Sequence, residues 1–229
     1  MKVHDVDQTR ESYFETQIAA SQKKFNYCKV STRCVARWKE IIQKNNAGNK
    51  GPIICMGTRN GREIDLFRTL FFGGLLQSLL VKLLEVRRYA FSSRFSLLES
   101  FGKSDVKSIN ENSVVGVELN SEGRRKDVHV GSFDELPLEW EGKFNIVYAN
   151  TLDHAQDPHK TAKEWYRVLA PGGYLIVGYP GEDVNASLVD NIGNITKEDI
   201  LRLFPGELVY FNRFGNCFQE VIIKKVKTE

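Results

Sequence analysis

The stretch that most constrains this fold is Gly51–Phe67, which reads GPIICMGTRNGREIDLF. Its apolar run 52–56 predicts a short buried strand, and a helical pattern begins at Arg62. Between them, Gly57 and Gly61 punctuate a turn. Glycine admits positive φ and lets the backbone approach a ligand closely, and a helix start offers unpaired N–H groups and a positive dipole end. The stretch therefore predicts a strand–turn–helix unit, which is either an ordinary tight loop or a binding turn for a nucleotide-like molecule.

The rest of the chain alternates strand-like apolar runs with helical patterns. Strands are predicted at Val114–Glu118, within 127–134, at Phe144–Ala149 and at Tyr174–Gly178, and helices at 62–72, at Pro158–Leu169 and from Thr196 to near Phe204. Two β-rich runs, Glu207–Phe214 and Cys217–Val226, flank Gly215 and Asn216, which is a hairpin signal. This order predicts an α/β fold: a Rossmann-like, seven-stranded, mostly parallel sheet with a C-terminal antiparallel hairpin.

Two helical regions flank the first strand–turn–helix unit. Within 8–44, apolar residues recur at spacings of three and four, so N-terminal helices are predicted, with a break near 30–32. We expect residues 1–50 to form a helical cap that packs beside the first strand and can roof a pocket. Residues 73–113 exceed an ordinary connection between a helix and a strand. They predict a helical insertion within a single domain that spans 1–229.

The insertion leaves three interpretations open. Its run Leu75–Leu84 is apolar nearly all round, which is typical of a helix that is buried or lies at an interface. It could cover the site or shape a substrate pocket, or it could form a homodimer interface through 73–95. Arg87, Arg88 and Arg94, interleaved with aromatic residues, also allow contact with a membrane surface or with RNA.

The composition bounds the cellular setting and excludes some functions. A chain of 229 residues suits one α/β domain, and a net charge of +3 is too small to indicate nucleic-acid binding by itself. The four cysteines lack metal-ligand spacing, so we expect reduced thiols and no metal site. The polar first residues carry no signal-peptide pattern, and no apolar run is long enough to span a bilayer. These features predict a cytoplasmic protein.

The predicted strands end in residues that suit a nucleotide-like ligand. In open parallel sheets, ligands bind outside the carboxyl ends of the strands. Glu118, at the end of one strand, is either a solvated acid or an acceptor for both hydroxyls of a ribose. At the end of the next, Phe133 could pack on an adenine ring and Ser132 could bond its exocyclic amine. Residues 150–154 follow the strand expected beside the first one, where the reactive end of the ligand would lie.

These features together resemble the class I S-adenosylmethionine-dependent methyltransferases, particularly those with the type 11 methyltransferase domain. The resemblance covers roughly 53–177 apart from the insertion. Its most specific part is 144–180, FNIVYANTLDHAQDPHKTAKEWYRVLAPGGYLIVGYP, which combines a strand, an Asp-His loop, a helix and Pro-Gly-Gly before the next strand. Three positions depart from the family pattern. Cys55 and Ser132 each stand where the family usually has an acid, and Arg59 replaces the middle glycine of the turn.

The resemblance implies S-adenosylmethionine as the cofactor and methyl transfer as the activity. The residues expected to bind the cofactor are Gly57, Thr58, Arg59, Gly61, Glu63, Glu118, Leu119, Ser132, Phe133, Asn150 and Thr151. Arg59 could pair with the cofactor carboxylate, and Glu63 could supply the missing acid. Asp153 and His154 are candidate general bases by place, needed only if the acceptor loses a proton. Alternatively, Asp153 bonds loop amides and His154 packs structurally. Tyr13 and Tyr27 could reach over the site from the N-terminal helices.

Several functions remain open at this point. The first is methylation of a small molecule or sugar, at an oxygen, in a pocket formed by the insertion and the N-terminal helices. RNA or protein acceptors are an alternative, although the basic run 124–126 reads more simply as solvated surface. A third possibility is a binding or scaffold protein that keeps the fold without catalysis. A nicotinamide dehydrogenase is disfavoured, because the turn reads GxRxG and not GxGxxG.

Overall fold

The computed structural model describes residues 1–3, 9–25, 28–45, 51–74, 104–214 and 218–226. Most of the predicted insertion lies outside these ranges, including its apolar run, its arginines and most of the proposed dimer surface. Tyr27 lies outside them as well. Across the described residues, every helix is too short or too polar to span a lipid bilayer.

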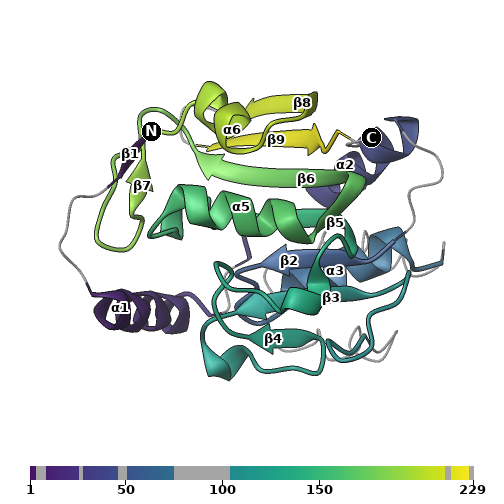
Figure 1. Ribbon diagram of the computed structural model, residues 1–229, viewed down its shortest axis with the longest axis horizontal. Coiled ribbons are helices and arrows are strands. Elements are labelled where there is room, and N and C mark those ends of the chain that lie inside the picture. The colour runs from purple at the N-terminus through teal and green to yellow at the C-terminus, as the bar shows by residue number, and fades with distance from the viewer. Residues whose placement is uncertain (4–8, 26–27, 46–50, 75–103, 215–217, 227–229) are drawn as a thin grey trace.

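One mixed sheet of seven strands forms the centre of the molecule (Figure 1). In spatial order its strands are β4 (Val128–Val130), β3 (Val114–Glu118), β2 (Ile53–Met56), β5 (Phe144–Ala149), β6 (Leu169–Pro180), β9 (Phe218–Lys224) and β8 (Glu207–Phe214). The pairs from β4 to β6 are parallel, whereas β9 runs antiparallel to both β6 and β8. The predicted fold class is therefore confirmed, including the terminal hairpin.

Helices cover both faces of the sheet, and the strand alternation shows why. On β2, Ile53 and Cys55 pack against one apolar cluster, and Ile54 and Met56 pack against another. The first cluster contains α2 (Thr32–Asn45) and α3 (Arg62–Phe71), and the second contains α5 (Pro158–Val168) and α6 (Lys197–Leu203). A strand buried on both faces is apolar at every position, as β2 is.

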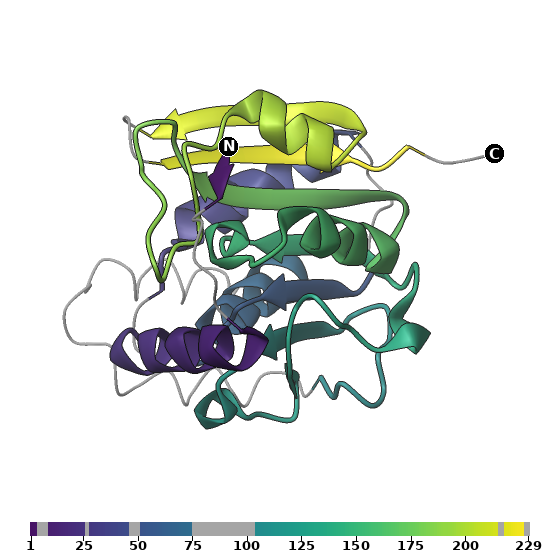
Figure 2. The same cartoon turned by 60° about the vertical axis from the view of Figure 1, so that its left-hand side comes forward.

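Helix α1 (Arg10–Lys23) belongs to neither layer. It lies beside the edge of the sheet at which the parallel strands end (Figures 1 and 2). Thr9 caps its first turn by accepting a hydrogen bond from the amide of Ser12 at 3.3 Å. Helix α1 ends at Lys23 and α2 begins at Thr32, so the predicted break between the two N-terminal helices lies close to its expected position.

Local signals explain most of the element ends. Thr196 and Asp199 form a capping box at the start of α6, and Asp157 caps α5 ahead of Pro158 at its first position. The structure adds a small antiparallel sheet of β1 (Lys2–Val3) and β7 (Ile192–Gly193), which is too short to show a sequence pattern. It also starts β6 at Leu169, five residues before the predicted strand.

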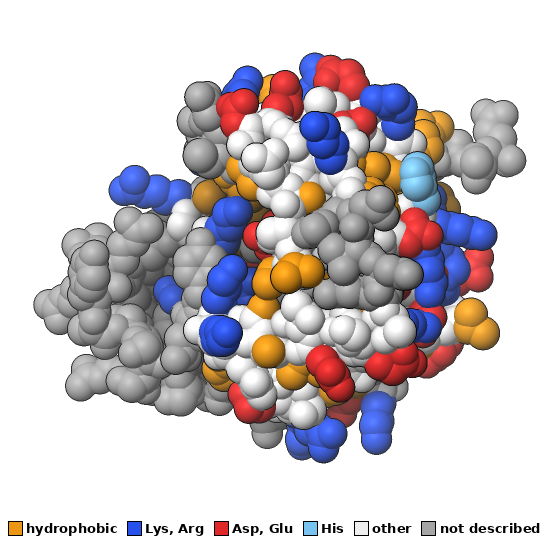
Figure 3. Space-filling view, turned by 90° about the vertical axis from the view of Figure 1, so that its left-hand side faces the viewer, with side chains coloured by type: hydrophobic (Ala, Val, Ile, Leu, Met, Phe, Trp, Pro, Cys, Tyr) orange, Lys and Arg blue, Asp and Glu red, His pale blue; other side chains and the backbone are white. Residues whose placement is uncertain are grey.

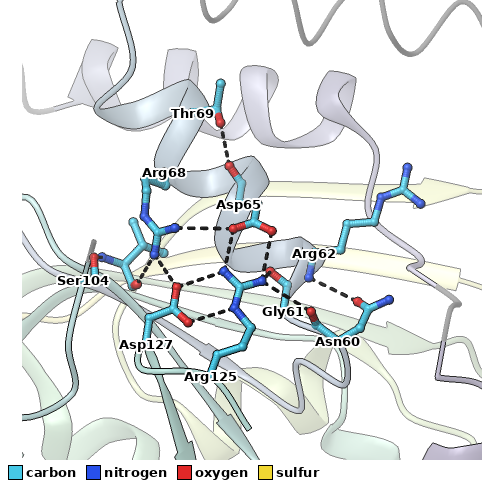
Figure 4. Close-up of polar contacts among 10 residues, drawn as sticks. Asn60, Gly61, Arg62, Asp65, Arg68, Thr69, Ser104, Arg125 and Asp127 are labelled. Carbon is cyan, nitrogen blue, oxygen red and sulfur yellow. Dashed lines mark hydrogen bonds and ion pairs between the residues drawn. The ribbon is translucent and has the colours of Figure 1, made fainter. Parts of the chain in front are cut away.

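Four charged side chains, of which Arg125 is partly buried and the other three are buried, fasten α3 to the segment just before β4 (Figure 4). Arg68 contacts Asp127 at 2.6 Å and Asp65 at 3.3 Å, and Arg125 contacts the same two carboxylates at 2.9 and 2.7 Å. Arg125 also donates to the carbonyl oxygen of Gly61 at 3.3 Å. The expectation that residues 124–126 are plain solvated surface is therefore wrong for Arg125. Its fork pairs with carboxylates from two elements that only the folded chain brings together.

We predict that Arg68→Met lowers the free energy of unfolding by about 3 kcal/mol, because it removes one cation from this buried network. Urea denaturation followed by circular dichroism measures the change. A matched control is Lys44→Met, which breaks the exposed pair between Lys44 and Glu40. The control should cost no more than about 0.5 kcal/mol. Equal effects of the two variants would contradict a special role for the buried network.

Candidate active site

The turn after β2 keeps a left-handed backbone at three positions. Gly57, Arg59 and Gly61 have φ values of 68°, 48° and 77°. A Cβ on Gly57 would lie 2.4 Å from a methyl carbon of Thr151, so this glycine permits the close approach of the β5 loop. Arg59 takes the left-handed conformation without being a glycine, at a cost of about 1 kcal/mol. Its amide donates to Oε2 of Glu118 at 2.6 Å, which holds the turn in place.

Glu118 is the polar centre of the site. It ends β3 and its residue is only 5% exposed. Its Oε1 accepts hydrogen bonds from the hydroxyl of Ser21 at 3.1 Å and from the amide of Asn120 at 3.0 Å. A carboxylate offers about four acceptor positions, and these two bonds and the bond from the Arg59 amide fill three of them. Among the described parts of the chain, one position is therefore left for a further donor, and the Ser21 hydroxyl fills a position that a ligand could take over.

A cleft opens between α1 and the ends of the parallel strands, and it holds about 640 Å³ when the space open to solvent is included. From the strand ends, the predicted residues that line it are Gly57, Arg59, Glu118, Leu119, Ser132, Phe133, Thr151 and His154. The cleft also lies where the chain leaves β2 on opposite sides toward β3 and β5, which is the place where open α/β sheets bind ligands.

The other predicted site residues lie outside the cleft lining. They are Thr58, Gly61, Glu63, Asn150 and Asp153. Thr58 is buried against Gly116, and Gly61 lies against the guanidinium of Arg125. Through these contacts, Thr58 and Gly61 anchor the turn to the neighbouring segments of the chain.

Glu63 is buried in the first turn of α3. Burial raises its pKa to about 7, while hydrogen bonds, including one with the Cys28 thiol, and the charges of Arg59 and Arg62 lower it. Its predicted role as the acid of the cofactor site stays a prediction.

One face of α1 forms the opposite wall of the cleft. That face comprises Tyr13, Phe14, Gln17, Ala20, Ser21 and Lys24. Polar contacts hold the helix at several points along its length: Gln17 donates to the Val189 carbonyl at 2.7 Å, Gln22 donates to Glu122 at 3.1 Å, and Arg10 pairs with Glu135 at 2.6 Å. Figure 3 shows the face of the molecule on which α1 lies, where Lys and Arg side chains gather beside apolar ones.

Sequence reasoning missed Asp134, Val189 and most of the α1 wall. Asp134 lies two residues after Ser132 and lines the cleft, where it accepts a hydrogen bond from Thr161. Burial raises its pKa, and the Thr161 hydroxyl and the charge of Lys160 lower it. Asp134 could have been predicted from the sequence, because it is an acidic residue close to the expected adenine position. Val189 could not have been predicted, because it belongs to a loop after β6 that only tertiary structure brings to the cleft.

The candidate general base, His154, lines the cleft. The short helix η4 (Leu152–His154) presents His154, whose Nδ1 lies 3.0 Å from the carbonyl oxygen of Val189 and 3.3 Å from Oδ1 of Asp190. Asp153 is partly buried, and burial raises its pKa while the charge of His154 lowers it. Within the described ranges, these three titratable residues also lie close enough together to be possible metal ligands.

Comparison with known proteins identifies the fold family. Residues 101–177, about a third of the chain, match the family model of a methyltransferase domain. The chain has a class I methyltransferase-like fold. This confirms the predicted resemblance over its second half, whereas the match does not include the unusual turn at 57–61. A search of curated proteins finds no significant match.

Solved structures support the same fold at low sequence identity. The Burkholderia thailandensis 1,6-didemethyltoxoflavin-N1-methyltransferase, with 1,6-didemethyltoxoflavin and S-adenosylhomocysteine bound, is 12% identical, has a TM-score of 0.59, and aligns over 98% of this chain and 94% of its own. The [4+2]-cyclase SpnF is 12% identical with a TM-score of 0.54, over all of both chains. A methyltransferase of Thermotoga maritima, described as a possible histamine N-methyltransferase, is 18% identical with a TM-score of 0.50, over 93% and 98%.

The buried Glu63 predicts a pH dependence of stability. Its folded-state pKa is raised from 4.5 to about 7, so the folded chain holds the proton more tightly than the unfolded chain does. The associated stability is therefore fully present below about pH 4.5 and is lost as the pH rises through about 7. We predict that Glu63 alone lowers the free energy of unfolding by about 3 kcal/mol between acidic and mildly alkaline pH.

Urea titrations at a series of pH values measure this loss. Glu63→Gln should flatten the profile over this range, because an amide does not titrate. Glu111→Gln, an exposed matched control, should leave the profile as it is in the wild type. An identical profile for the Glu63 variant and the wild type would remove the carboxyl of Glu63 as the cause.

Proposed function

We propose that the protein is an S-adenosylmethionine-dependent methyltransferase that methylates a small molecule at an oxygen atom. The observation that carries the proposal is the carboxylate of Glu118, which lines a cleft beside the glycine turn at the switch point of a methyltransferase-like sheet. The match of residues 101–177 to a methyltransferase domain supports it independently of that geometry.

The donors and acceptors of the cleft fit the cofactor. Glu118 keeps an acceptor position for a ribose hydroxyl, and Phe133 and Leu119 offer apolar surface for the base. Asp134 can accept a hydrogen bond from the exocyclic amine of adenine. It can therefore take the part of the acidic residue that the family usually has at the position of Ser132. Arg59 offers a cation to the carboxylate of the methionine portion.

In the proposed reaction, the main task of the protein is to position the acceptor. When bound, the cofactor supplies a sulfonium methyl group that is already activated for transfer. In this proposal His154 would take the proton that the acceptor hydroxyl loses when its oxygen is methylated. The cleft walls from α1 and β5 hold the acceptor in line with the methyl group.

The lining of the cleft favours a small acceptor. Tyr13, Phe14 and Val189 give it apolar walls, while Gln17 and Lys24 add polar groups. One of the similar structures is described as an N1-methyltransferase and another as a possible N-methyltransferase, so ring nitrogens belong in an acceptor screen beside hydroxyl groups.

The described cysteines Cys28, Cys34 and Cys55 are free thiols, which fits the expected cytoplasmic location.

The likeness to a [4+2]-cyclase favours a second candidate function. That enzyme shares this fold, so a protein of this shape can serve a reaction other than methyl transfer. In this alternative the cleft binds a small molecule without methylating it. Binding of cofactor together with failure of every acceptor to receive a methyl group would move this candidate ahead.

Calorimetric titration with S-adenosylmethionine and S-adenosylhomocysteine tests the first function. We predict binding to the wild type, and weakening by about 1.5–3 kcal/mol in Glu118→Ala through loss of the bonds to ribose hydroxyls. Glu139→Ala removes an exposed carboxylate outside the cleft and should bind as the wild type does. No binding to the wild type would refute the proposed function, and unchanged affinity in Glu118→Ala would refute the role of Glu118.

The hydrogen bond from Ser21 to Glu118 should compete with the binding of the cofactor. Its hydroxyl occupies an acceptor position on Oε1 of Glu118 that the second ribose hydroxyl would need. We therefore expect Ser21→Ala to bind S-adenosylhomocysteine more tightly, by about 0.5–1.5 kcal/mol, because no protein bond has to be exchanged. Ser12→Ala changes an exposed serine of the same helix and serves as the control. Weaker binding by Ser21→Ala would show that the hydroxyl contacts the ligand itself.

A further inference from the structure

His154 lies where three segments of the chain meet. Its Nδ1 is 3.0 Å from the carbonyl oxygen of Val189 and 3.3 Å from Oδ1 of Asp190, both in the loop between β6 and β7. The same carbonyl accepts a hydrogen bond from Gln17 of α1 at 2.7 Å. The loop therefore joins the wall of the cleft to the imidazole.

The two atoms beside Nδ1 decide where the ring carries its proton. A carbonyl oxygen has no proton to give, and an ionised carboxylate only accepts. Nδ1 must therefore be the donor in both contacts. In the neutral ring this leaves Nε2 with its lone pair, because a neutral imidazole holds one proton on its two nitrogens.

We propose that Asp190 is a positioning residue that, with the Val189 carbonyl, holds His154 in the tautomer protonated on Nδ1. The inference rests on the proposed function, in which His154 takes the proton of the acceptor. That proton arrives on Nε2 and makes the ring cationic. The carboxylate of Asp190, 3.3 Å from the opposite nitrogen, stabilises the charge that forms.

The same residues have the composition of a metal site, but their geometry favours the hydrogen-bonded pair. Potential ligand atoms of Asp153, His154 and Asp190 lie within 4.8 Å of one another. However, Nδ1 donates to the carbonyl oxygen of Val189 at 3.0 Å, so a metal ion bound at Nδ1 would have to displace that proton and break this hydrogen bond. In addition, Lys29 lies within electrostatic range of both carboxylates and already provides a cation there.

The protonation of the ring can be observed without knowing the acceptor. Long-range proton–nitrogen spectra of the ¹⁵N-labelled protein at mildly alkaline pH distinguish the two tautomers of each neutral histidine. The chain has four histidines, and the signals of His154 are identified by their loss in His154→Gln. We expect His154 of the wild type to be protonated on Nδ1. Protonation on Nε2 would overturn the proposal.

Substitution of Asp190 tests whether its carboxylate determines the tautomer of His154. Asp190→Asn should shift His154 toward the tautomer protonated on Nε2, because the new amide can donate to Nδ1. Asp183→Asn makes the same change at an exposed position of the same loop and should leave the spectrum unchanged. An Asp190 variant with the wild-type tautomer would overturn the role of Asp190.

Kinetics give a second readout once the screen provides an acceptor. Asp190→Asn should lower kcat about tenfold or more while KM and the affinity for S-adenosylhomocysteine stay unchanged. A fall in affinity with unchanged kcat would contradict positioning of the base. Failure of the wild type to bind the cofactor would refute the proposed function, while the tautomer measured by spectroscopy would still decide the geometry at His154.

Discussion

The carboxylate of Glu118 is the interaction on which the rest of the site depends. It ties the end of β3 to the turn after β2 through the Arg59 amide, and to α1 through the Ser21 hydroxyl. Without it, the backbone amides of Arg59 and Asn120 would lose their acceptor and the cleft would lose its polar centre. The position of this side chain follows from the parallel pairing of β2 and β3, which brings their carboxyl ends to one edge.

The turn reaches a ligand-binding shape without the glycine usual at its centre. Arg59 adopts positive φ because its amide is held by Glu118, and its carbonyl lies close to Gly123, where a Cβ would approach within 2.2 Å. On the other side, Arg125 holds the carbonyl of Gly61 while pairing with buried carboxylates. Backbone strain at one residue is therefore offset by contacts from two neighbouring loops.

Most of the fold could be predicted from local sequence patterns. Periodicity and capping rules predict the ends of β3 and β5, the cap at Thr196 and the hairpin. Parallel pairing of the strands then places Glu118 beside the turn. The missed residues share a different origin. Ser21 contacts Glu118, 97 positions away, and Arg125 contacts Asp65, 60 positions away, while Asp190 belongs to a loop that the fold returns to the sheet edge. No short-range spacing encodes such contacts.

The wall formed by α1 has an unusual energetic character. Among its residues only Tyr13 is buried, and the helix is held by ion pairs and by amide and hydroxyl bonds to the rim. The exposed ion pair is screened by salt, and the hydrogen bonds can be exchanged for bonds to other partners. The attachment of this wall therefore responds to ionic strength and to competing hydrogen-bond partners.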